Sequence, residues 1–159
     1  MGAGIDFVVI GGVAVGAHGV LRATKDLDVC PAPDGANLAR LATLLRELGV
    51  SQVGVEDGGF TAREMPFDPT RPDELAQGGN FRLETPFGTL DLMQWIPGIS
   101  QDSAYAVLAG NAVTAHAFGL AVQVCSLADL RLMKRAAGRP RDLQDLEDLA
   151  AAHPELADD

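Results

Sequence analysis

The sequence has little positive charge, few aromatic residues, only two cysteines and no long hydrophobic segment. Twelve lysines and arginines stand against 22 aspartates and glutamates, which gives a formal net charge of −10. Proteins that bind nucleic acid regardless of sequence need a broad basic face, so this class is disfavoured, although a nucleic acid held at one basic patch is not. Aromatic residues make up only 5%, and the plentiful alanine and glycine therefore predict many small, closely packed contacts.

The hydrophobic segments and the cysteines indicate in which cellular compartment the protein is expected. The apolar stretch 7–21 is too short to span a bilayer and lacks the basic segment that begins a signal peptide. Cys30 and Cys125 stand in apolar surroundings without the spacing of metal ligands, and we expect both to be buried free thiols. A cytoplasmic protein that does not associate with membranes is the prediction.

The length of 159 residues predicts one domain over residues 1–159. The clearest helix is 36–48, in which leucines recur every three or four residues between Asp34 as N-cap and Gly49 as terminator. Further helices are predicted at 13–17, 102–109, 127–137 and 140–151, strands at 7–10, 26–30, 51–55, 81–84, 88–94, 112–117 and 120–125, and a long irregular stretch at 56–79. The fold class is α/β (α+β), a small mixed sheet flanked by helices, with a C-terminal helical pair over about residues 126–151.

Two glycines, Gly11 and Gly12, separate the first predicted strand from the first helix. A glycine turn lets the backbone approach a ligand closely, and the N–H groups at a helix start favour an anion such as a phosphate. The glycine spacing does not match a dinucleotide-binding fingerprint, and no P-loop lysine follows. A phosphate seat and a plain structural turn both remain open.

Three aspartates carry the strongest chemical signal. Asp26 and Asp28 alternate with apolar residues, so on a strand they share one face, where their mutual repulsion calls for a divalent cation between them. Asp91 stands alone in an apolar strand, a costly position unless it is ligated or hydrogen-bonded. Three converging carboxylates can hold two divalent ions roughly 3.5–4 Å apart, as in phosphoryl transfer. The alternatives are a solvated edge strand for the pair and an arginine partner for Asp91.

These motifs together resemble a known superfamily. Gly11-Gly12, Arg22-x-Thr24-x-Asp26-x-Asp28 and Asp91 in Gly-Thr-Leu-Asp-Leu resemble the polymerase-beta-type nucleotidyltransferases. The segment 133–146, with a lysine, arginines and Arg-Asp-x-x-Asp, is similar to one branch, the AbiEii and MenT nucleotidyltransferase-like toxins of toxin–antitoxin systems. The resemblance extends over about residues 5–150 and implies the nucleotidyltransferase fold.

The resemblance also implies an activity and a set of roles. A nucleotide from a nucleoside triphosphate is transferred, with Mg²⁺ or Mn²⁺, to an RNA acceptor, the tRNA 3′ end in MenT-like toxins, and a cognate antitoxin is the expected protein partner. The metal ligands would be Asp26, Asp28 and Asp91, with Asp91 also able to act as base. The nucleotide would be bound by Gly11, Gly12, Arg22, Thr24, Lys134 and Arg139, with Lys134 also catalytic. Asp142 and Asp145, on one helix face, would orient the lysine or the acceptor end.

Three alternatives stay open at this point. The basic run around Lys134 and Arg139 is also typical of a solvated helix face. The same transfer chemistry could act on a protein hydroxyl or on a small molecule such as an aminoglycoside. A catalytically silent domain that binds a partner protein would explain the motifs without any reaction. The superfamily's usual Gly-Ser is Gly-Gly here, so backbone N–H groups would have to replace the serine hydroxyl.

Overall fold

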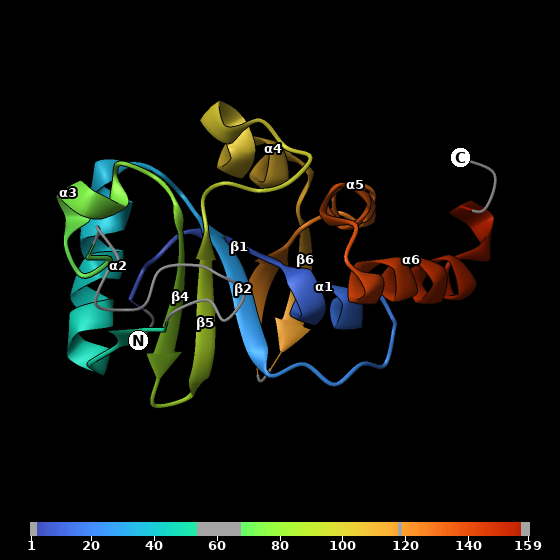
Figure 1. Cartoon of the computed structure of the whole chain (residues 1–159), viewed down its shortest axis with the longest axis horizontal. Coiled ribbons are helices and arrows are strands. Elements are labelled where there is room, and N and C mark those ends of the chain that lie inside the picture. Colours follow the sequence, from blue (N-terminus) through green and yellow to red (C-terminus); the bar gives the residue numbers. More distant parts are fainter. Residues whose placement is uncertain (1–2, 54–67, 118, 157–159) are drawn as a thin grey trace.

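The computed structural model describes residues 3–53, 68–117 and 119–156, which form one mixed seven-stranded sheet with helices around it (Figure 1). The strand order is β3-β4-β5-β2-β1-β7-β6. The strands are β1 (Phe7–Ile10), β2 (Asp26–Pro31), β3 (Ser51–Gln52), β4 (Asn80–Thr85), β5 (Gly88–Met93), β6 (Val113–Ala117) and β7 (Leu120–Val124). The predicted fold class is therefore confirmed.

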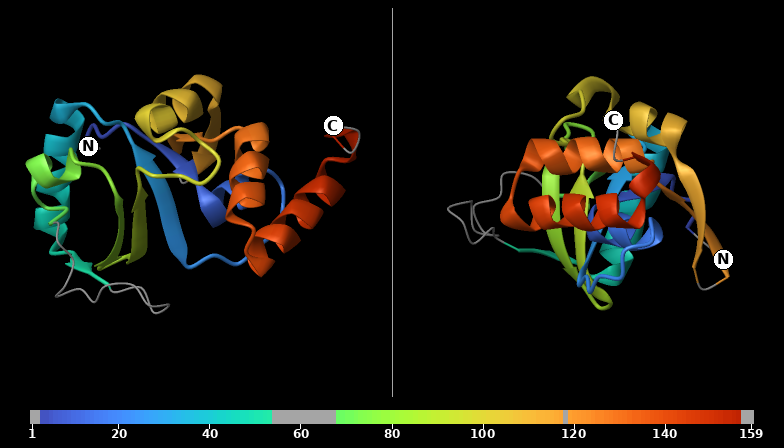
Figure 2. Two further views of the ribbon diagram at one scale, coloured as in Figure 1. Left: turned by 45° about the horizontal axis from the view of Figure 1, so that its top comes forward. Right: turned by 90° about the vertical axis from the view of Figure 1, so that its right-hand side faces the viewer.

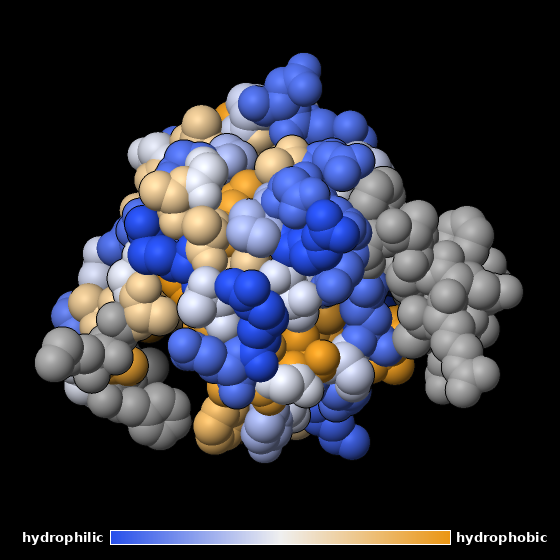
Figure 3. Space-filling model, turned by 90° about the vertical axis from the view of Figure 1, so that its left-hand side faces the viewer, coloured by the Kyte–Doolittle hydropathy of each residue, from blue (hydrophilic) through white to orange (hydrophobic). Residues whose placement is uncertain are grey.

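Two pairs of helices lie at the two ends of the sheet, and α1 and α4 pack on its central strands β1 and β2 (Figure 1). The α-helices are α1 (Gly11–Ala17), α2 (Gly35–Leu48), α3 (Pro72–Leu75), α4 (Ala104–Asn111), α5 (Leu127–Ala137) and α6 (Pro140–Ala152), and short 3-10 helices occur at Gln101–Ser103 and Pro154–Leu156. In Figures 1 and 2, α2 and α3 lie beside one end of the sheet, whereas α5 and α6 lie beside the other. Figure 3 shows the side that carries α2 and α3, where hydrophilic residues predominate and hydrophobic residues form small groups between them.

Most predicted boundaries agree with the structure to within one residue, and the larger differences include the following. Helix α1 begins at Gly11 rather than at residue 13, so the glycine pair is its first turn. Helix α4 begins two residues later than predicted because a 3-10 turn precedes it. The stretch 56–79 contains α3, whose proline at the helix start was not read as a signal. Residues 54–67 lie outside the described ranges, and the described part of the strand predicted at 51–55 is two residues long.

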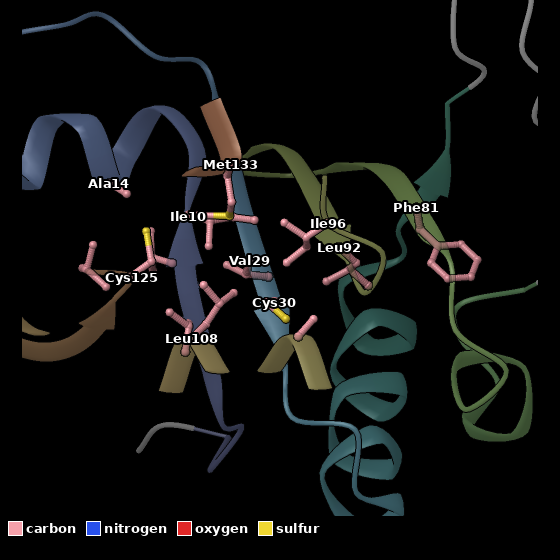
Figure 4. Packing of buried hydrophobic residues seen from close by; sticks show 14 of the residues in the cluster. Ile10, Ala14, Val29, Cys30, Phe81, Leu92, Ile96, Leu108, Cys125 and Met133 are labelled. Atoms are coloured by element: carbon pink, nitrogen blue, oxygen red, sulfur yellow. The ribbon is translucent and has the colours of Figure 1, made fainter. Parts of the chain in front are cut away.

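One core holds the sheet and helices together. Side chains from β1, β2, β5, α4 and α5 converge in Figure 4, among them Ile10, Val29, Leu92, Leu108 and Met133. Both cysteines are buried free thiols, as predicted, and burial raises the pKa of each to about 12. Among the described residues, none of the helices combines the length and the apolar composition that a membrane crossing requires.

Candidate active site

The three predicted carboxylates meet on one face of the sheet. Strands β2 and β5 are parallel neighbours, and their register places Asp28 directly beside Asp91. Asp26 lies two residues before Asp28, so its side chain points to the same face. The side chains of Asp28 and Asp91 are close enough for each to shift the pKa of the other. Two strands far apart in the sequence thus bring together the aspartates that the sequence analysis singled out.

The surroundings of this face raise the pKa values of two of the carboxyl groups, Asp28 and Asp91. Burial, followed by the nearby charge of Asp26, raises the pKa of Asp28, while a hydrogen bond from the Gly12 N–H and the charge of Lys134 work against that rise. Burial also raises the pKa of Asp91 to about 6, helped by the charges of Asp28 and Asp26. A carboxyl with such a pKa exchanges its proton near neutral pH, which suits a proton acceptor.

The glycine pair is explained by its contacts with Asp28 and Thr24. Gly11 has a φ of +65°, and a Cβ there would stand 2.1 Å from Asp28 Oδ2. A Cβ on Gly12 would stand 2.8 Å from Thr24 Oγ1. The Gly12 N–H donates a hydrogen bond to the Asp28 carboxylate. In the structure the turn therefore seats the protein's own carboxylate, and a phosphate role for it stays a prediction.

A second set of charges lies between α5 and α6. Lys134 Nζ is 2.9 Å from Asp142 Oδ1 and 2.7 Å from Asp145 Oδ2. All three residues are buried, with 7%, 1% and 2% of their surfaces exposed respectively. The i, i+3 spacing of the two aspartates puts both on one face of α6, opposite the lysine of α5. The predicted orientation of Lys134 by these aspartates is consistent with these contacts.

Two arginines extend this set into a network that ties the α6 start to the segment before β2. Arg22 Nη1 is 2.6 Å from Asp145 Oδ2, and Arg139 Nε is 2.7 Å from Asp142 Oδ2. Burial alone would raise the pKa of Asp142, but the hydrogen bonds from Arg139 and Lys134 outweigh it and lower that pKa. We call Arg22, Lys134, Arg139, Asp142 and Asp145 the C-terminal charge network.

A cavity of about 860 Å³ opens between the carboxylates and this network. Ten of the eleven predicted site residues line it: Gly11, Gly12, Arg22, Thr24, Asp26, Asp28, Asp91, Lys134, Arg139 and Asp142. The eleventh, Asp145, is not among the lining residues and acts through its bonds to Lys134 and Arg22. The lining also includes Lys25, Arg82 and Arg141, which the sequence analysis did not select.

Arg82 of β4 is the most informative of the missed residues. Its Nη2 donates to Asp26 Oδ2 at 2.9 Å and its Nη1 to Asp91 Oδ2 at 3.1 Å, so it bridges two strands. The sequence contained a signal for the pairing of Arg82 with Asp91. The turn that joins β4 to β5 pairs Thr85 with Gly88, and three further steps away from the turn along each strand pair Arg82 with Asp91. We call Asp26, Asp28, Asp91 and Arg82 the carboxylate cluster.

The carboxylate cluster has the right chemistry for a hard divalent cation. Its donors are carboxylate oxygens, which Mg²⁺ and Mn²⁺ prefer, and two of its three carboxylates pair with one guanidinium. In the described ranges 3–53, 68–117 and 119–156, however, no group of three or more His, Cys, Asp or Glu side chains is arranged to hold a metal ion. The predicted metal ligands lie next to one another, but they are not arranged around a common metal position, and Arg82 pairs with both Asp26 and Asp91.

Known proteins provide one kind of match. No family model and no curated protein matches the sequence. The lincomycin-bound structure of the lincosamide antibiotic adenylyltransferase LnuA matches with a TM-score of 0.57 and 12% identity, over 93% of this chain and 87% of that chain. The chain has the nucleotidyltransferase fold. The antibiotic-resistance factor ANT(2'')-Ia also has this fold and matches with a TM-score of 0.53 and 19% identity, over 96% of this chain and 75% of that one.

This likeness confirms the fold that the motifs predicted. In the nucleotidyltransferase fold of this chain, the carboxylate cluster lies on β2, β4 and β5 and the C-terminal charge network lies mainly on α5 and α6. Membership of the AbiEii and MenT branch stays a prediction from the sequence resemblance.

Proposed function

We propose that the protein is a metal-dependent nucleotidyltransferase that moves a nucleotide from a nucleoside triphosphate to a hydroxyl of RNA, the tRNA 3′ end in particular. The observation that carries the proposal is the register of Asp28 beside Asp91, with Asp26 on the same face, at the wall of the cavity. A divalent cation held by these carboxylates would stabilise the charge that develops on the phosphate oxygens.

The reaction assigns separate tasks to the residues of the chain. The acceptor hydroxyl oxygen forms a bond to the α-phosphorus, the bond from that phosphorus to the bridging oxygen breaks, and pyrophosphate leaves. Asp91, with its pKa raised to about 6, accepts the hydroxyl proton. Asp28 is held against the first turn of α1 by the Gly12 N–H and orients the cluster.

Positive charge at the cavity supports a polyanionic pair of substrates. Six of the twelve lysines and arginines of the chain line this one cavity, in a protein with a net charge of −10: Arg22, Lys25, Arg82, Lys134, Arg139 and Arg141. Arg22 lines the cavity, and its Nε is a buried donor without a hydrogen-bond partner among the described residues. Lys134 is bound by two aspartates, so in this proposal it sets the local charge rather than moving to the triphosphate.

The test is a labelling assay. The protein is incubated with total RNA, Mg²⁺ and each α-labelled nucleoside triphosphate in turn, beside Asp28→Ala and beside Asp102→Ala, which changes an exposed aspartate that does not line the cavity. We expect label on RNA of tRNA size with the wild type and with Asp102→Ala, and a loss of at least about 100-fold with Asp28→Ala, because an essential charge is removed. Labelling that survives in Asp28→Ala contradicts the assignment.

A second acceptor class has its own support. The two solved structures described above are named for antibiotics, one as a lincosamide antibiotic adenylyltransferase bound to lincomycin and one as an antibiotic-resistance factor. A nucleotidyltransferase that modifies a small-molecule hydroxyl is therefore the second candidate. The same assay with an aminoglycoside and a lincosamide in place of RNA distinguishes the two, because label then appears on the small molecule and not on RNA.

The toxin role and the antitoxin partner belong to the same proposal and rest on the sequence resemblance. They predict that induced expression stops bacterial growth, that Asp28→Ala abolishes the arrest, and that a neighbour-encoded protein relieves it. A catalytically silent domain that binds a partner protein makes different predictions. It would bind no nucleoside triphosphate in calorimetry, with or without Mg²⁺, and Asp28→Ala would leave its partner complex intact.

A further inference from the structure

Arg82 is the only cationic residue of the carboxylate cluster as defined above, and it contacts aspartates on two other strands. It lies directly opposite Asp91 in the β4–β5 register and also reaches past β5 to Asp26 on β2. Each bond uses an Oδ2 atom, and Asp26, Asp91 and Arg82 all line the cavity. The guanidinium therefore holds two of the oxygens that a cation entering from the cavity would use.

The Arg82 guanidinium is open to solvent, so its contacts can be exchanged. The Arg82 side chain is 40% exposed and that of Asp26 is 35% exposed, whereas that of Asp91 is 14% exposed. An ion pair as exposed as the one with Asp26 contributes little net free energy, so the contact with Asp91 is the stronger of the two. Arg82 pairs with Asp26 and Asp91, and the strand register places Asp28 beside Asp91, so one guanidinium lies among three carboxyl groups.

We propose that Arg82 is a built-in counter-cation of the carboxylate cluster, which competes with the divalent cation for Asp26 and Asp91. The inference rests on the proposed metal-dependent function. Arg82 is a positioning residue: it holds the carboxylates together without a metal ion and must release both oxygens when one binds. An entering cation therefore has to displace it, and metal affinity in the intact protein is lower than the three carboxylates alone would provide.

Arg71 offers a matched control in the same chain. It also forks between two carboxylates, with Nη2 3.1 Å from Asp73 Oδ2 and Nη1 3.3 Å from Glu74 Oε1. It is 59% exposed, stands before α3 and does not line the cavity. Arg71→Gln removes the same charge and the same kind of fork without touching the carboxylate cluster.

The test titrates Mn²⁺ into the wild type, Arg82→Gln and Arg71→Gln and follows free Mn²⁺ by electron paramagnetic resonance. We expect Arg82→Gln to bind Mn²⁺ about tenfold more tightly than the wild type, which corresponds to about 1.4 kcal/mol, and Arg71→Gln to be unchanged. Arg82→Lys keeps the charge but cannot donate to two carboxylates as a guanidinium does, so its Mn²⁺ affinity should lie between those of the wild type and Arg82→Gln. If Arg82→Gln does not fold, the comparison of Arg82→Lys with the wild type tests the proposal.

The outcomes separate this inference from the function on which it rests. Equal or weaker Mn²⁺ binding by Arg82→Gln, in a wild type that does bind Mn²⁺, overturns the competition and leaves the metal-dependent function standing. Absence of Mn²⁺ binding at millimolar concentration in the wild type and in every variant overturns both. A tenfold gain that Arg71→Gln shares would also overturn the inference, because net charge rather than displacement would then be the cause.

Discussion

The carboxylate cluster and the C-terminal charge network border one cavity, but their charges are balanced in opposite ways. The cluster sets three aspartates against one arginine that is 40% exposed. The network sets two aspartates, each at most 2% exposed, against Lys134 and two arginines. An excess of carboxylate next to a cavity favours binding of a cation. In the network, two buried aspartates are matched by three cationic side chains, and these contacts hold α5, α6 and the segment before β2 together.

The contrast also shows in the proton affinities. Burial raises the pKa values of Asp28 and Asp91, because positive charge nearby does not make up for the water they lose. Asp142 is 1% exposed, yet its pKa is lowered, because Arg139 and Lys134 donate hydrogen bonds to it. Burial by itself therefore does not distinguish a reactive carboxylate from a structural one; the number of cationic donors does.

The largest expected effect is that of Lys134→Met on stability. It leaves Asp142 and Asp145 buried without their shared lysine, and we expect the free energy of unfolding to fall by about 3–5 kcal/mol. Urea unfolding measures it, with Arg135→Met on the exposed side of the same helix as control. A loss below about 1 kcal/mol would mean that the network does not hold the helices.

Lys134→Met should lower stability, whereas Asp91→Asn should remove a loss of stability that occurs as the pH rises. The folded protein binds the Asp91 proton up to about pH 6, compared with 3.8 for the free side chain, so without divalent cations stability falls as the pH rises between these values. The variant should lose this fall, worth at most about 3 kcal/mol at pH 7. Thermal unfolding with a chelator at pH 4 and pH 7 measures it, with Asp102→Asn as control. A variant that keeps the slope contradicts this reading.

Gly11→Ala should disturb the cluster through the backbone. The positive φ costs an L residue about 1–2 kcal/mol, and the new Cβ would displace the Asp28 carboxylate. We expect lower stability together with weaker Mn²⁺ binding. Gly16→Ala, in the same helix and with no atom within 4 Å of the added Cβ, should be neutral or stabilising by up to about 1 kcal/mol. Equal effects of the two substitutions would argue against the close seat of Asp28.

The smallest expected loss of stability is that of Arg139→Ala, at the most exposed residue of the C-terminal charge network. The Arg139 side chain is 74% exposed, so Arg139→Ala should cost less than about 1 kcal/mol. Arg22→Ala should cost more, because that side chain is 16% exposed and its partner Asp145 is buried. Urea unfolding of both variants checks the order, and the reverse order would show that burial does not rank these contacts.

Several parts of the site were readable from the sequence because they depend on local chemistry. Alternation along one strand puts Asp26 and Asp28 on one face, and the i, i+3 spacing does the same for Asp142 and Asp145. Ser126 and Gly138 mark the ends of α5, as predicted. The role of Arg82 escaped because its partner on β2 is 56 residues away, and only the sheet order brings the two together.

The sequence alone thus determined most of the elements, the caps of α2 and α5 and which side chains share a face, since these follow from local residue types and from periods of two and 3.6 residues. The tertiary structure decided which faces meet. It placed β5 between β4 and β2, so that one arginine spans two aspartates, and it closed α5 and α6 around Lys134, so that a predicted catalytic lysine lies in a buried ion network. Pairings between distant segments depend on the packing of the whole sheet, which no local pattern records.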